Sequence, residues 1–126
     1  MSKIENLRPD EGIRLDPDCL VALYAELGQQ NAEQVLACAM EEMAVHIATI
    51  SRAAQRNAPH RLIDAAESLG KIARHVGMEA LAKVSEDVAL CALTGDRVGL
   101  SATLNRLIRI GDRSLTAVWD MPDLIG

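Results

Sequence analysis

The chain has 126 residues, 49% of them apolar, which is the length and composition of a single folded domain with a hydrophobic core. Its formal net charge of −5 does not supply the basic surface that binding to phosphate backbones requires, so we expect no nucleic-acid partner. No apolar run approaches the roughly 20 residues needed to cross a bilayer, and the sequence does not begin with the apolar segment of a signal peptide. We therefore expect a cytoplasmic protein without a membrane partner.

The aromatic residues and the cysteines narrow the fold class and the chemistry. Only Tyr24 and Trp119 are aromatic, whereas small and aliphatic side chains are abundant, which favours packed helices over sheets. The fold class that we expect is all-α. The cysteines form an odd set without a Cys-x-x-Cys spacing, so we expect reduced thiols in or near the core, no metal site and no cofactor. They are Cys19, Cys38 and Cys91.

The N-terminal part of the chain predicts an arm and a short helix. Residues 1–14 are polar and aperiodic and are expected to form a flexible N-terminal arm. Asp16 is then suited to the N-cap and Pro17 to the first position of a helix. This helix should end at about Leu27, because Gly28 follows.

Two longer helices are predicted in the middle of the chain. The second helix is expected to be capped by Asn31, and apolar residues recur along it at alternating spacings of four and three, a pattern typical of bundles. These are Leu36, Met40, Met43, Ile47, Ile50 and Ala54. Residues 56–58 close this helix, and Pro59 begins the third helix, which Gly77 ends. The buried side of the third helix should consist of Leu62, Ala66 or Ala65, Leu69, Ala73 and Val76.

The fourth and fifth helices are expected to follow at once. The fourth should run from about Met78 to Leu93 and end at Gly95, with an inner side made of Leu81, Val84, Val88 and Cys91 or Ala92. Asp96 is the expected N-cap of the fifth helix. The apolar residues of this helix are Leu100, Leu104, Leu107, Ile108, Leu115 and Val118. Gly111 lies within it, where glycine costs about 1 kcal/mol relative to alanine, so we expect a bend or a frayed segment there.

Short connections between these helices force sequence neighbours to lie antiparallel. The expected architecture is an up-down antiparallel four-helix bundle with a short N-terminal lead-in helix, spanning residues 15–119. Residues 120–126 form a C-terminal tail, which together with Trp119 is apolar enough either to pack back over the bundle or to anchor a partner.

The segment from Ala66 to Gly77 resembles the signature helix of histidine-containing phosphotransfer (Hpt) domains. The pattern of that family is roughly Ala-His-Ser-Leu-Lys-Gly-Ser-Ala, with a further glycine about ten residues after the histidine. The residues in register with it are Ala66, Ser68, Leu69, Ala73 and Gly77. The phosphate-accepting histidine of the family is replaced here by Glu67, and the Lys-Gly pair is inverted to Gly70 and Lys71.

This resemblance covers about residues 16–118 and implies the fold of an Hpt domain, a lead-in helix packed on a four-helix bundle. It also implies a role in two-component phosphorelay signalling, with a response-regulator receiver domain or a histidine kinase as the partner. Phosphotransfer needs an imidazole nucleophile, which Glu67 lacks. We therefore expect no catalytic residue and no enzymatic activity.

The face around Glu67 is the expected partner-binding surface. With 100° per residue, Glu67 lies about 200° from Leu69 around the helix and so faces solvent. The predicted partner-binding residues on or beside this face are Asp64, Glu67, Ser68, Lys71 and Arg74. The alternative interpretation is an ordinary exposed Glu-Lys pair, which stabilises a helix by about 0.3 to 0.5 kcal/mol.

Two histidines of the third helix are alternative phosphate acceptors. His75 lies about 80° around the helix from Glu67, at the C-terminal end, where the helix dipole favours the imidazolium form. His60 is almost in line with Glu67 but stands in the first turn, at the end of the bundle.

Three functions remain open from the sequence. The first is an Hpt-like protein that binds receiver or kinase domains without its own acceptor. The second is an active phosphotransfer protein that uses His75 or His60. The third is a helical bundle with an unrelated structural or scaffolding role.

Overall fold

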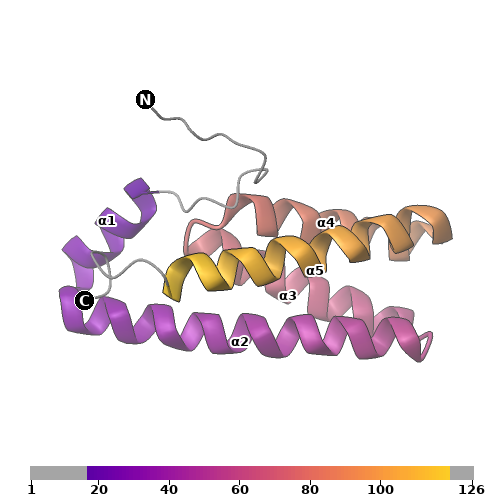
Figure 1. Ribbon diagram of the computed structural model, residues 1–126, viewed down its shortest axis with the longest axis horizontal. Coiled ribbons are helices and arrows are strands. Elements are labelled where there is room, and N and C mark those ends of the chain that lie inside the picture. The colour runs from indigo at the N-terminus through magenta and orange to yellow at the C-terminus, as the bar shows by residue number, and fades with distance from the viewer. Residues whose placement is uncertain (1–16, 120–126) are drawn as a thin grey trace.

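The computed structural model describes residues 17–119, and within that range the chain is entirely helical except for short turns (Figure 1). The helices are α1 (Pro17–Leu27), α2 (Gln29–Gln55), α3 (Pro59–His75), α4 (Glu79–Thr94) and α5 (Arg97–Trp119). No strand occurs in this range, which confirms the all-α prediction. The predicted arm (1–14), the N-cap at Asp16 and the tail (120–126) lie outside the described residues.

The helices pack mainly against their neighbours in sequence. The most extensive pairing joins α3 to α4, followed by α2 with α3 and α4 with α5. The contact between α2 and α5 is much smaller, and α1 packs chiefly on α2. Figure 1 shows α2 to α5 running along the long axis of the molecule, whereas α1 is inclined to them at one end. No helix of the part described here is long and apolar enough to span a membrane.

Three helices end in the same way. One or two residues beyond each end, a residue has a left-handed backbone: Asn57 (φ 55°) after α2, Gly77 (φ 84°) after α3 and Gly95 (φ 74°) after α4. The next N–H then donates to a carbonyl five positions back, the mark of a Schellman motif. These bonds are Ala58 N to Ala53 O (2.9 Å), Met78 N to Ala73 O (2.8 Å) and Asp96 N to Cys91 O (3.0 Å). The predicted ends of these helices are confirmed, because glycine and asparagine tolerate this conformation.

The starts of two helices differ in how well the sequence predicted them. Asp96 caps α5 as predicted, since its Oδ1 accepts the Gly99 N–H at 2.9 Å. The N-cap at Asn31 is wrong: α2 begins two residues earlier, and the Asn31 Nδ2 instead donates to the Leu27 carbonyl at 3.2 Å. The reason is Gly28, whose carbonyl already accepts the Ala32 N–H (2.9 Å), so the helix has started before Asn31 is reached.

The predicted buried faces of α2, α3 and α4 are confirmed. Along α2, Ile47 and Ala54 are half-buried and the other four predicted residues are buried. All predicted residues of α3 are buried, including both Ala65 and Ala66. In α4 the predicted leucine and valines are buried, whereas Cys91 and Ala92 are only half-buried.

The predicted inner face of α5 needs a correction. Ile108 is 41% exposed, whereas Ile110 is buried at 4%. The buried row is Leu107, Ile110, Gly111 and Ser114, which follows the helical spacing of three and four. Leu100, Leu104 and Leu115 are half-buried at its edge, and the side chain of Val118 lies outside the described set. A row that includes glycine and serine carries little apolar signal, so the sequence pattern favoured the wrong isoleucine.

Gly111 does not interrupt α5, which continues without a break from Arg97 to Trp119, so the expected fraying is wrong. Gly111 is instead buried against α2: a Cβ placed on it would lie 2.8 Å from Ile47 Cδ1. The absence of a side chain therefore lets α5 approach α2 at this point.

Candidate docking surface on α3

The exposed side of α3 presents the residues that the sequence placed there. Glu67, Lys71, Arg74 and Asp64 are exposed, and Ser68 is half-buried. The helix turns Leu62, Leu69 and Ala73 to the core, as the apolar spacing predicted. His60 and His75 are also exposed, near the two ends of the helix.

The side of α3 next to this face packs on α4 through small residues. Gly70 is buried, and a Cβ placed on it would lie 3.6 Å from both the Ala82 carbonyl oxygen and Ser85 Cβ. Ser85 is itself fully buried and donates its hydroxyl to the Leu81 carbonyl at 2.7 Å. The inversion of the Lys-Gly pair thus has a structural counterpart: the glycine lies in the helix interface, and Lys71 reaches solvent.

Arg74 is not a free cation on this surface, because two acidic residues of α4 hold it. Its Nη1 donates to Glu86 Oε2, and its Nε lies 3.6 Å from Glu79 Oε1. The hydrogen bond from Arg74 lowers the pKa of the Glu86 carboxyl below its usual value, and the same bond raises the pKa of Arg74 further. Glu79 and Glu86 are seven residues apart and therefore share one face of α4, a spacing that could have been found in the sequence.

The pairing with α4 divides the predicted surface into two parts. Arg74 belongs to a hollow of mixed charge that is also lined by Glu79, Lys83, Glu86 and, from α5, Arg106. Lys71 lies on the other side, next to α2. The structure therefore brings Asp64, Glu67 and Lys71 together on the exposed side of α3 and directs Arg74 toward α4.

A groove borders Lys71 that the sequence did not predict. It has a volume of about 620 Å³ and lies between the end of α1, the first half of α2 and the last turns of α3. Its apolar lining includes Leu27, Val35, Cys38, Ile72 and Val76, and its polar lining includes Glu42, Lys71 and His75. We call it the α2–α3 groove. A lining that combines apolar and polar side chains is usual for a protein-binding surface.

The described residues offer little for covalent or metal chemistry. Among residues 17–119 no three His, Cys, Asp or Glu side chains are grouped so that they could hold a metal ion. The three cysteines are free thiols, and Cys19 Sγ donates to the His75 carbonyl at 3.2 Å. A nucleophilic histidine is normally oriented by a second polar group. In this part of the chain, no side-chain hydrogen bond or ion pair orients the imidazole of His60 or His75.

Comparison with known proteins gives no match: no family model fits the sequence, and neither a curated protein nor a solved structure is significantly similar to it. The assignment of a function therefore depends on the residues and surfaces described above.

Proposed function

We propose that this protein is an Hpt-like, up-down antiparallel four-helix bundle with α1 as the lead-in helix, and that it acts in two-component phosphorelay signalling. It binds a response-regulator receiver domain or a histidine kinase, and it does so without a phosphate acceptor of its own. The observation that carries the proposal is the position of Glu67: exposed in the middle of α3, where the resembling motif has its histidine, with Lys71 between it and the α2–α3 groove.

The chemistry of Glu67 supports a binding role over a transfer role. A carboxylate is not the imidazole nucleophile that a phosphorelay needs, and phosphate transfer onto it would require cations that neutralise the moving phosphoryl group. Arg74, which lies seven residues after Glu67 on α3, is already engaged by Glu79 and Glu86. A protein with such a surface occupies a receiver domain and blocks access of its normal partner.

The α2–α3 groove supports the choice of Lys71 as the key charged residue. A lysine at the edge of an apolar groove steers an acidic partner and fixes its orientation, while the apolar floor supplies contact area. The pocket of a receiver domain is acidic, so its charge complements Lys71. Arg74 is a poorer test residue, because reversing its charge would also break its ion pairs with α4.

The test compares Lys71→Glu with Lys83→Glu, a matched reversal at an exposed lysine of α4 that does not line the groove. Binding of the full chain to a panel of purified receiver domains and histidine kinases is measured by calorimetry, with circular dichroism as the folding control. We expect Lys71→Glu to weaken binding by about tenfold at low salt and Lys83→Glu to leave it nearly unchanged. Equal affinities for the two variants, or no binding by the wild type, would overturn the proposal.

A labelling experiment separates this proposal from the two other functions. The chain is incubated with an autophosphorylating kinase and with a phosphorylated receiver, and we expect binding without label on this protein. An acid-labile, base-stable label that disappears in His75→Ala or His60→Ala would establish an active phosphotransfer protein instead. If the chain shows neither binding nor label, a structural or scaffolding role remains.

The variant Glu67→His sharpens the same point. We expect weak label or none, because Gly70 remains buried against α4 and the lysine remains one position later than in the family pattern. Strong phosphorylation of this single variant would mean that the missing imidazole is the only defect of the site.

A further inference from the structure

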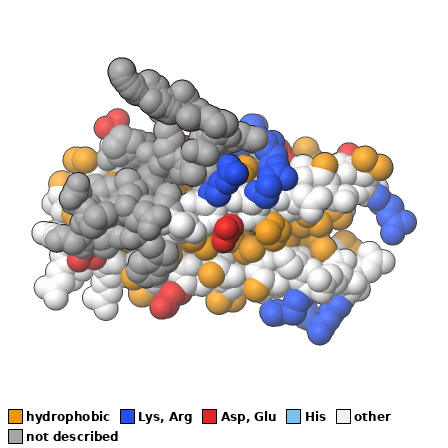
Figure 2. All heavy atoms as spheres, in the orientation of Figure 1, with side chains coloured by type: hydrophobic (Ala, Val, Ile, Leu, Met, Phe, Trp, Pro, Cys, Tyr) orange, Lys and Arg blue, Asp and Glu red, His pale blue; other side chains and the backbone are white. Residues whose placement is uncertain are grey.

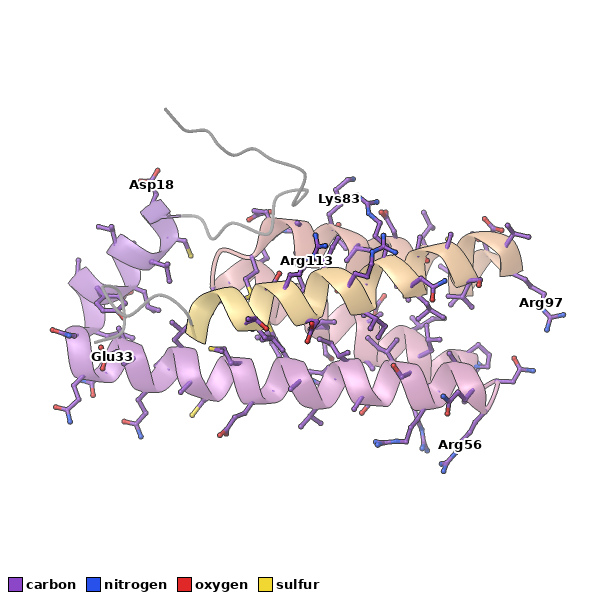
Figure 3. All side chains as sticks on the ribbon, viewed as in Figure 1. Asp18, Glu33, Arg56, Lys83, Arg97 and Arg113 are labelled. Carbon is purple, nitrogen blue, oxygen red and sulfur yellow. The ribbon has the colours of Figure 1, made fainter. Side chains whose placement is uncertain are left out.

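The end of the molecule that carries the α2–α3 and α4–α5 turns is basic, although the chain as a whole is acidic. From residue 44 to residue 63 the sequence contains Arg52, Arg56 and Arg61 but no aspartate or glutamate. Arg97 stands at the start of α5, beyond the neighbouring turn. Figure 3 shows Arg56 and Arg97 at this end, both directed away from the body of the molecule, whereas Asp18 and Glu33 lie at the opposite end. Figure 2 shows Lys and Arg side chains at this end and along the lower edge beside it, and a second group in the middle of the view.

These four arginines are not neutralised within the described structure. All of them are exposed, and across residues 17–119 none of them has an ion pair or a side-chain hydrogen bond. The acidic residue at this end that lines the adjoining groove, Asp96, uses its carboxylate to cap α5. This situation contrasts with Arg74, whose charge is balanced by two carboxylates of α4.

An apolar groove lies between the two turns. It has a volume of about 380 Å³, and its walls include Ala54, Leu62, Ala92 and Leu100, with Arg97 at its edge. We call it the turn-end groove. It stays open because α5 makes only a small contact with α2, so that Ala54 and Leu100 remain half-buried. The volume falls within the range of about 300 to 1,000 Å³ that is usual for binding pockets.

We infer that the turn-end groove binds an acidic amphipathic segment of a partner protein. Aliphatic side chains of that segment enter the groove, and its aspartates and glutamates pair with Arg56, Arg97 and their neighbours. Charge complementarity identifies the occupant, since an apolar groove lined by Arg97, at an end of the molecule that carries further unpaired arginines, matches an acidic and apolar ligand. The apolar lining of the groove favours a peptide with aliphatic side chains over a nucleic acid, which has no such side chains to insert.

The site is separate from the proposed receiver-binding surface. Lys71 and the α2–α3 groove adjoin the end of α1 and the last turns of α3, whereas the turn-end groove adjoins the start of α3. The two inferences can therefore fail independently.

The experiment measures binding of fluorescent synthetic peptides to the full-length protein by anisotropy. The first peptide is a helix former with leucines at positions i, i+3, i+4 and i+7 and glutamates elsewhere. The second has serines in place of the leucines, and the third has lysines in place of the glutamates. We expect binding of the first peptide only, with an affinity that falls as salt is raised from about 20 mM to 500 mM.

The protein variants locate the site. We expect the pair Arg56→Glu and Arg97→Glu to weaken binding of the leucine-glutamate peptide by about tenfold or more. The pair Lys83→Glu and Arg109→Glu makes the same change in net charge away from the groove, and it should stay within about twofold of wild type. Circular dichroism checks that each variant is folded. The pair Arg56→Gln and Arg97→Gln removes the two charges without reversing them, and it should give an intermediate loss of affinity for the leucine-glutamate peptide.

Several results would overturn the inference. Equal binding to the arginine variants would remove the turn-end groove as the site. Equal binding of the serine peptide would mean attraction by charge alone, without insertion into the groove. Binding to vesicles of phosphatidylserine and phosphatidylcholine, but not to the peptide, would identify a membrane-binding surface. If the first peptide did not bind at all, the turn-end groove would have no docking role.

Discussion

The contact of α3 with α4 and the contact of α2 with α5 are built in opposite ways. Between α3 and α4, small residues such as Gly70 and Ala82 let the backbones come close, and this pairing is the most extensive in the molecule. Between α2 and α5 the contact is narrow, with Ile47 placed over Gly111. Hydrophobic side chains consequently show at the surface between α2 and α5 in Figure 2. The stability of the protein should therefore depend mainly on the α3 side, while the α5 side is left available for contacts with other molecules.

The largest effect that this comparison predicts comes from truncating one buried leucine of α3. Leu69 is fully buried, so Leu69→Ala removes apolar contacts and leaves a cavity, which should lower the free energy of unfolding by about 2 to 5 kcal/mol. Ile108→Ala in α5 should cost less than about 1 kcal/mol, because that side chain is 41% exposed. Guanidinium unfolding curves measure both values. Similar losses for the two variants would contradict the buried position of Leu69 and the exposed position of Ile108.

Two substitutions of Gly70 should change the free energy of unfolding by smaller amounts and in opposite directions. In Gly70→Ala the new Cβ meets Ala82 and Ser85 at ordinary contact distance, so the gain in helix propensity should stabilise the protein by about 0.5 to 1 kcal/mol. Gly70→Leu forces a branched side chain into the interface and should destabilise it by about 1 to 3 kcal/mol. Thermal and chemical unfolding test both variants, with Ala44→Leu on the exposed side of α2 as the control. If Gly70→Leu were as stable as wild type, the α3–α4 interface would be looser than described.

The smallest effect concerns the ion pair that links α3 to α4 at the surface. The folded-state pKa of Glu86 is lowered by Arg74, so its carboxylate stabilises the fold above the ordinary value of 4.5 and loses this contribution as the pH falls through the lowered pKa. Glu86→Gln should therefore be slightly less stable than wild type at pH 7 and equally stable at pH 2. The difference should be small, because the two side chains are 49% and 53% exposed. Urea unfolding across this pH range measures it, and a difference that grows toward acid pH would show that Arg74 is not the main partner of Glu86.

Most of the helical framework could be predicted because its signals are local. The apolar spacing of α2, α3 and α4 identifies their buried sides, and the residues that end these helices are of types that accept a left-handed backbone. The features that were missed depend on contacts between helices. The choice between Ile108 and Ile110 depends on the close approach of α5 to α2 at Gly111, and the engagement of Arg74 depends on which face of α4 lies beside α3. Both grooves likewise combine residues from three or more segments, so no single stretch of sequence carries their signal.

The repeated Schellman turns also bear on how fast the protein folds. Each turn after α2, α3 and α4 completes its hydrogen bonds within a few neighbouring residues, and the helices that it joins are those with extensive pairing. Each helical hairpin can therefore form early, without waiting for distant segments to meet. Helical domains dominated by such local contacts fold on timescales of roughly microseconds to milliseconds. The narrow contact of α5 with α2, which joins segments far apart in the chain, is then the step that we expect to form last.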